Sequence, residues 1–255
     1  MLAQAVGGAG TTILSLTLAA LGAVYLWRWQ CAVDLVSVSR VWAFLAGLAT
    51  IWLAMGPVLG HLDQGTLTAH MVQHLLLMTV AAPLLWLGDP GRVLSAANGA
   101  SPRIQIPAPH PLLCWFVGTG IVLFWHVPAL FEVGMRWHLL QQLTFLAAGL
   151  LFWIPVIRPW PTVTAWPRWS IVAYLFSATL PCDALSAFLT FCGRVIYQRY
   201  CFTGGVGISA LDDQVRAGAL MWFWVTIAYL VPAALVTMEL LSPAPRARGI
   251  AGSGR

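Results

Sequence analysis

The chain has 255 residues, of which 60% are hydrophobic and only 8% are charged, and its mean hydropathy is +0.81. Because soluble domains carry about 25% charged residues, this composition excludes a soluble globular protein and indicates an integral membrane protein. The net charge of +5 comes from arginine without a single lysine, which excludes a retinal protein, since retinal needs a lysine for its Schiff base.

Seven stretches are long and apolar enough to cross a bilayer, which takes about 20 residues. In chain order they are Thr11–Trp27, Val41–Gly60, Thr66–Gly88, Pro111–Phe131, His138–Ile157, Trp169–Gly193 and Ala217–Leu241. The sequence therefore predicts an all-α fold, a bundle of seven transmembrane helices in one membrane domain over residues 1–241. Residues 242–255 form a short basic tail that we expect to be disordered and cytoplasmic.

The arginines fall unevenly between alternate loops. Nine lie in the first, third and fifth loops and the tail, and four lie in or beside the other loops. Since cytoplasmic loops carry the excess of basic residues, we predict that the N-terminus lies outside and the C-terminus in the cytoplasm. The basic charge thus reflects topology in the lipid bilayer, and we expect no nucleic-acid partner.

Histidines gather near the outer end of this predicted bundle. His70 and His74 lie four residues apart in the third stretch, so they share one helix face. His126 lies at the outer end of the fourth stretch, His138 opens the fifth, and His61 closes the second. Titratable groups at membrane depth are costly and usually mark a functional site.

Methionines accompany these histidines, at Met71 and, deeper in the same stretch, at Met78. Imidazole suits copper, zinc, iron and nickel, whereas thioether selects Cu(I). The sequence therefore predicts a metal site with His70, His74, His126 and His138 as ligands and with Met71, Met78 and His61 as accessory residues. Two alternatives stay open: histidines that only form hydrogen bonds between helices, and a bis-histidine haem.

Two further polar features lie in the last third of the chain. Asp183 follows a proline in the middle of the sixth stretch, where it is either a polar relay or an anchor beside a kink. Cys192 and Cys201 are close enough in sequence for a disulfide in an oxidising compartment. The alternative is two free thiols, since buried free cysteine behaves as a small apolar residue.

The order of several motifs resembles a known family. The stretches are HMVQHLLLMTVAAPLLWLG at His70–Gly88, FWHVPALFE at Phe124–Glu132, HLLQQLTFLAAGLLFWIPV at His138–Val156, the pair Tyr197 and Tyr200, and LDDQVRAGALMW at Leu211–Trp222. In this order they resemble the seven-span CtaG family of bacterial cytochrome c oxidase assembly factors. The resemblance covers about Val41 to Leu241.

The resemblance implies a role in building haem–copper oxidase, through copper insertion into the catalytic subunit, in the bacterial cytoplasmic membrane. By motif match the family's histidines correspond to His70, His74, His126 and His138. Its acidic-Gln pair corresponds to Asp213 and Gln214, which are candidate polar or relay groups. The sequence departs from the family at Gln141 and Gln142, where members commonly carry Glu-His.

Three hypotheses follow for the function of the chain. The first is a non-enzymatic assembly factor that delivers copper to cytochrome c oxidase subunits at the outer leaflet. The second is an accessory subunit, bound stably to a respiratory complex and holding no metal, which the two glutamines favour. The third is a haem-binding electron-transfer protein.

Overall fold

The computed structural model describes residues 2–62, 65–96, 109–157, 167–201 and 207–242, and within these ranges the chain is helical, without a strand. The helices are α1 (Leu2–Trp29), α2 (Val38–Met55), α3 (Pro57–Leu62), α4 (Leu67–Leu75), the π-helical segment η1 (Leu76–Ala81), α5 (Ala82–Leu87), α6 (Pro90–Ala96), α7 (Pro111–His126), α8 (Pro128–Arg136), α9 (His138–Ile157), α10 (Arg168–Phe191), the 3₁₀ segment η2 (Gln198–Cys201) and α11 (Ala210–Leu241). The all-α prediction is confirmed.

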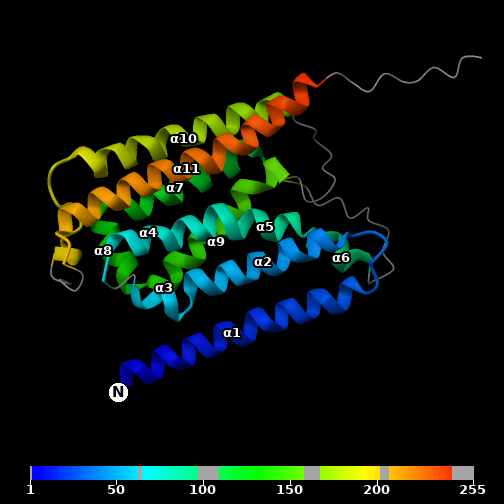
Figure 1. The fold of residues 1–255 in the computed structure, drawn as a ribbon, viewed down its shortest axis with the longest axis horizontal. Helices are drawn as coiled ribbons and strands as arrows, with labels where there is room; N and C mark the ends of the chain where they lie inside the picture. Colours follow the sequence, from blue (N-terminus) through cyan, green and yellow to red (C-terminus); the bar gives the residue numbers. More distant parts are fainter. Residues whose placement is uncertain (1, 63–64, 97–108, 158–166, 202–206, 243–255) are drawn as a thin grey trace, which may run out of the picture.

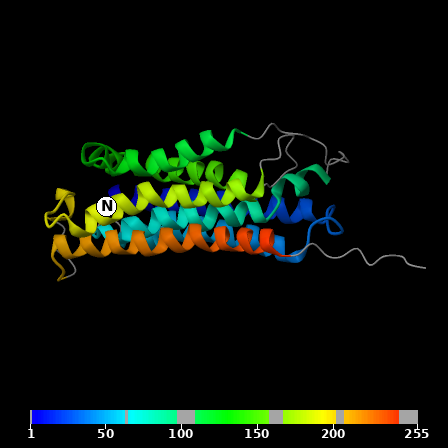
Figure 2. The same ribbon diagram turned by 90° about the horizontal axis from the view of Figure 1, so that it is seen from above.

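The long helices run side by side along one axis (Figure 1), and they keep that direction when the molecule is turned (Figure 2). The short helices α3 and α8 lie at one end of the bundle, where α4 begins, and α6 lies at the other end. α11 packs along α10, and α9 packs against both α7 and the α4–η1–α5 stretch. α1 lies at the edge of the bundle against α2 and α6.

Within the described ranges, six stretches are long and apolar enough to cross a membrane: Ala9–Trp29, Val38–Gly60, Leu67–Ser95, His138–Ile157, Arg168–Phe191 and Ala210–Leu241. A seventh exists only if α7 and α8, which meet at a bend of 90°, are taken as one span. The chain is thus a multi-pass membrane protein, and the predicted fourth span, Pro111–Phe131, is broken, since its helix ends at His126 and α8 follows after the bend.

The bend between α7 and α8 follows from Pro128. A proline disfavours the helical conformation of the residue before it, and Val127 is accordingly extended, with φ −64° and ψ 124°. α7 therefore ends at His126, and α8 turns across the end of the bundle. The break leaves His126 in the last turn of its helix, beside the start of α9.

The last helix begins at Ala210, seven residues before the predicted Ala217. The side chain of Ser209 caps it by accepting a hydrogen bond from the Asp212 amide at 3.1 Å, as expected of serine at a helix start. Asp213 and Gln214 therefore lie in the first turns of α11, not in a loop.

Candidate metal centre

Four imidazoles from three helical stretches converge at one end of the bundle. His70 and His74 come from α4, His126 from the end of α7 and His138 from the start of α9. The ring centres are 4.1 Å apart for His70 and His74, 6.1 Å for His70 and His138, and 6.5 Å for His74 and His126. The first three of these residues are buried and His138 is half-buried. The predicted ligand set is therefore one cluster.

The ring spacing shows which pairs can share an ion. A metal bonded to a ring nitrogen at about 2.0 Å lies about 3.2 Å from the ring centre, so two rings on a tetrahedral ion have centres about 5 Å apart. The distances of 4.1, 6.1 and 6.5 Å all differ from this value: His70 and His74 are too close, and His74 and His126 are too far apart, to share a tetrahedral ion in this conformation. No three His, Cys, Asp or Glu side chains of the described residues surround one ion position.

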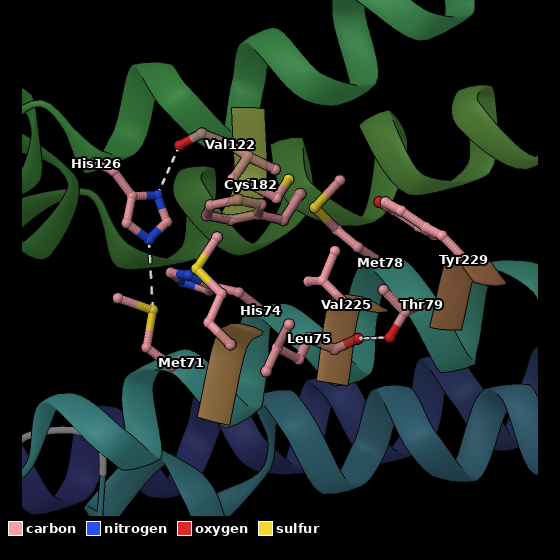
Figure 3. A pocket seen from close by; sticks show the side chains of 12 residues that line it. Met71, His74, Leu75, Met78, Thr79, Val122, His126, Cys182, Val225 and Tyr229 are labelled. Carbon is pink, nitrogen blue, oxygen red and sulfur yellow. Dashed lines mark hydrogen bonds between the residues drawn. The ribbon is translucent and has the colours of Figure 1, made fainter. Parts of the chain in front are cut away.

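The orientation of His126 is fixed by its own helix. Its Nδ1 lies 2.6 Å from the Val122 carbonyl oxygen. Because a carbonyl can only accept, Nδ1 carries the proton, and in the neutral ring Nε2 has a free lone pair. That Nε2 lies 3.4 Å from the sulfur of Met71 in α4 (Figure 3).

His74 is buried without a hydrogen bond at either ring nitrogen. Its ring stacks on Phe145 of α9, with ring centres 3.9 Å apart. A neutral imidazole always carries one N–H, and leaving a buried donor unpaired costs about 1–3 kcal/mol. Buried polar groups without a partner are rare in native proteins and require an explanation. An ion or a water molecule beside this ring would explain why the protein itself provides no partner.

A cavity of about 30 Å³ lies beside these rings. It is lined by Met71, His74, Leu75, Met78, Thr79, Val122, His126, Phe145, Cys182, Met221, Val225 and Tyr229 (Figure 3). Its volume suits one or two water molecules or a bare ion. Four of the lining residues carry sulfur and two carry imidazole, and none of the described residues that line it is acidic. Such a donor set is soft in the sense of metal coordination.

The π-helical segment η1 shapes the deeper part of the cavity. Its wider turn leaves the Met78 carbonyl to accept a hydrogen bond from Trp153 Nε1 of α9 at 2.8 Å. α9 approaches here at Gly149, where a Cβ atom would lie only 2.8 Å from the Met78 Cα. π-Helical turns often occur at functional sites, where they re-aim side chains. Here the segment places Met78 on the cavity wall.

A group of glutamine amides lies between the histidines and α8. Gln142 Nε2 lies 3.4 Å from both the Gln73 Oε1 atom and the His138 Nε2 atom. Gln141 is fully buried, and neither atom of its amide has a hydrogen bond. Its amide packs against Gly134 of α8, where a Cβ atom would meet Gln141 Nε2 at 2.6 Å. Gln142 thus faces the histidine cluster and Gln141 faces α8, and neither adds a strong metal ligand.

Asp213 and Gln214 hold the polypeptide around the cluster. The Asp213 carboxylate accepts hydrogen bonds from the backbone amides of Leu67 and Thr68, at 2.6 and 3.2 Å, at the start of α4. Gln214 accepts from the Ile196 amide at 2.7 Å and donates to the Arg194 carbonyl at 3.0 Å. Both residues, predicted as polar or relay groups, therefore position α4 and the segment that follows α10.

The remaining predicted residues stand apart from the cluster. Asp183 is half-buried in α10, and the cavity is lined by its neighbour Cys182 instead. His61 lies in α3, and its side chain is outside the described part of the chain. Cys192 is a free thiol, so the disulfide with Cys201 is not formed. The side chain of Cys201 also lies outside the described part.

No role was predicted for three residues of the site, although Tyr197 and Met221 lie in stretches that carry the family resemblance. Tyr197, in the segment after α10, is buried, and its hydroxyl donates to the His126 carbonyl at 2.9 Å. Met221 and Tyr229 reach the cavity from α11. Aromatic and sulfur residues are common in apolar helices, so nothing local distinguishes these from other core residues.

A family model described as cytochrome c oxidase caa3 assembly factor (Caa3_CtaG) matches residues 20–242. The chain belongs to this family. The match confirms the resemblance that the motifs indicated, over a longer range than Val41 to Leu241. No curated protein and no solved structure matches the chain.

In this member of the Caa3_CtaG family, the residues that match the family motifs fall into two groups. The four histidines form one cluster, of which His74 and His126 line the cavity, whereas Asp213, Gln214 and Tyr197 hold backbone in place around them. The glutamines at 141 and 142 keep the buried position but offer only neutral amides. The site of this member therefore depends on imidazole and sulfur.

Proposed function

We propose that this Caa3_CtaG protein assists the insertion of copper into the catalytic subunit of a haem–copper cytochrome c oxidase, as a non-enzymatic assembly factor. His70, His74, His126 and His138 are the proposed ligands, with Met71 and Met78 as accessory donors. The observation that carries the proposal is His74, a buried imidazole with no hydrogen bond at either nitrogen, placed in a cavity with a second imidazole. Imidazoles in this arrangement offer lone pairs to a cation.

The proposed place of delivery is the outer leaflet of the bacterial cytoplasmic membrane. It depends on the arginine distribution, which puts the end of the bundle that carries the histidines outside. His138 is the half-buried member of the cluster and lies nearest to the surface of that end. The proposed partners are therefore oxidase subunits that approach this end from within the bilayer.

The cavity supports a metal ion in preference to haem. A cavity of about 30 Å³ holds one or two water molecules and is far too small for a porphyrin. A haem between His74 and His126 would require α4, α7 and α9 to move apart. The third hypothesis therefore has less support than the first.

The decisive experiment is oxidase maturation in cells that lack this protein. Cells complemented with the natural chain should regain oxidase activity and a full copper content of the isolated oxidase. Complementation with His74→Ala should restore neither, while His110→Ala, which changes an exposed histidine at the start of α7, should restore both. Equal oxidase copper content in all strains would contradict the proposal.

The accessory-subunit hypothesis has one observation in its favour. Gln73, Gln141 and Gln142 are buried neutral amides, and Gln142 joins Gln73 to His138, an arrangement that also suits a purely structural contact between helices. In that case the chain would remain bound to the mature oxidase in equal amount. Purification of the oxidase through a tag on its catalytic subunit, with quantification of this chain, distinguishes the two functions.

A further inference from the structure

We infer that the cavity is a Cu(I) site in which His126 Nε2 and Met71 Sδ are the paired donors, next to His74 and Cys182. The inference deepens the proposed function, on which it rests, by naming the oxidation state of the ion and a sulfur ligand. It differs from an all-histidine site, in which Met71 would be replaceable.

At the contact between His126 and Met71, a lone pair of Nε2 faces a lone pair of Sδ. The Val122 carbonyl takes the only proton of the neutral imidazole, and a thioether has no proton to donate. The 3.4 Å separation of Nε2 and Sδ is therefore not a hydrogen bond between neutral groups. A protonated ring would make one, but it would place an unpaired cation in a cavity without an acidic lining residue, which is costly.

The same separation suits two ligands of one ion. With metal–nitrogen and metal–sulfur bonds of about 2.0 and 2.3 Å, an ion that joins atoms 3.4 Å apart has an N–metal–S angle of about 104°. That angle is near tetrahedral. His74, with both nitrogens unpaired, lines the same cavity, and its ring centre lies 6.5 Å from that of His126, so its ring would have to move toward His126 to join the same ion.

The surroundings favour a soft, monovalent ion. Cys182, Met78 and Met221 add sulfur to the cavity wall, and the other lining side chains are aliphatic, aromatic or hydroxyl-bearing. Thioether ligands favour Cu(I), whereas thiolate also binds zinc and iron–sulfur clusters, and three of the four sulfur residues on this cavity are methionines. The cost of transferring an ion from water into an apolar site grows with the square of its charge, so a divalent ion without a carboxylate partner is strongly disfavoured.

The histidine chain connects this site with the end of the bundle. From the cavity outward the rings follow in the order His126, His74, His70 and His138, at centre distances of 6.5, 4.1 and 6.1 Å. His70 and His74 are too close to ligate one ion together, but they are well spaced for consecutive single contacts. This arrangement gives the ion a route between the cavity and the half-buried His138.

The test is Cu(I) binding by the full-length protein, purified in detergent and titrated without oxygen against a coloured Cu(I) chelator. We expect one Cu(I) per chain, displaced by Ag(I) but not by Zn(II), and an X-ray absorption spectrum with both sulfur and nitrogen neighbours. Met71→Leu, which conserves volume, should weaken binding at least about tenfold, since even indirect partners of a metal contribute that much. Met55→Leu, a half-buried methionine of α2 outside the cavity, should leave it unchanged.

Three results would overturn the inference: a copper spectrum without sulfur neighbours, equal Cu(I) affinity of Met71→Leu and the natural chain, or Zn(II) binding at similar affinity. The spectrum of the natural chain decides the matter even if a variant folds poorly. The outcome is also separate from the maturation experiment in cells. Cu(I) binding with normal maturation in cells that lack the protein would contradict the function alone, and failed maturation without Cu(I) binding would contradict this site alone.

Discussion

Thr68 and Asp213 join the first turn of α4 to the first turn of α11, although 145 residues separate them in the chain. The Thr68 hydroxyl donates to Asp213 Oδ1 at 2.6 Å, and its backbone amide donates to the same oxygen at 3.2 Å. Together with the Leu67 amide on Oδ2, this carboxylate satisfies the exposed donors at the start of the helix that carries His70 and His74. A negative charge at a helix N-terminus is also favoured by the helix dipole.

We therefore expect Asp213→Asn to lower the free energy of unfolding by about 1–3 kcal/mol, because one amide nitrogen would face a backbone or hydroxyl donor. Asp212→Asn, an exposed neighbour in the same turn, should change it by less than about 0.5 kcal/mol. Thermal unfolding of both variants in the same detergent measures the difference. Equal unfolding temperatures would show that the Asp213 contacts add no stability.

Gly149 allows α9 to approach the π-helical segment beside the cavity. In Gly149→Ala the new Cβ would lie 2.8 Å from the Met78 Cα, a backbone atom that cannot move alone. We expect a loss of about 1–3 kcal/mol in the free energy of unfolding, as for other overpacked interiors. The matched control is Gly120→Ala in α7, where no atom lies within 4 Å. That change should be neutral or stabilise by up to about 1 kcal/mol.

A pH-dependent contribution is expected from Tyr197. Burial raises the pKa of its phenol, because the charged form loses its hydration. The stability that comes with the neutral phenol is complete below the unfolded pKa of about 10 and is lost as the pH rises above it. Tyr197→Phe keeps the ring against Phe131 but removes the hydrogen bond to the His126 carbonyl.

At neutral pH this variant should lose about 1 kcal/mol, and above pH 10 its stability should fall less steeply than that of the natural chain. Unfolding temperatures between pH 7 and about pH 11 test both statements. Parallel curves for the two proteins would contradict the role assigned to the phenol.

The double variant Gln141→Glu and Gln142→His restores the pair that the family commonly carries. A carboxylate in place of the fully buried Gln141 amide should destabilise the metal-free protein. A divalent ion that binds the new ligands should reverse this loss, since any ligand of the folded state stabilises it. We expect the unfolding temperature to rise with added Zn(II) in the double variant but not in the natural chain. The same response in both proteins would show that the glutamines do not limit metal choice.

Local patterns were sufficient for the class of the protein and for most of its helices. Of the seven spans predicted from apolar length, six are confirmed as single spans, because the cost of exposing polar backbone to lipid acts on each segment separately. Four-residue spacing placed His70 and His74 on one face of α4, as helix geometry requires. Pro128 predicts a helix break after His126. The apolar residues on both sides of it, however, favoured one continuous span.

Only the packing of α4, α7, α9 and α11 decided what the site contains. The sequence named the histidines but could not show that His126 turns its free nitrogen toward Met71, that His74 lacks a hydrogen bond, or that Met221 reaches the same cavity. It gave Asp213 a polar role, whereas the fold uses that carboxylate to hold the start of α4. Hydrophobic periodicity is a property of each helix alone, whereas the distance between side chains on different helices is set by how those helices approach each other.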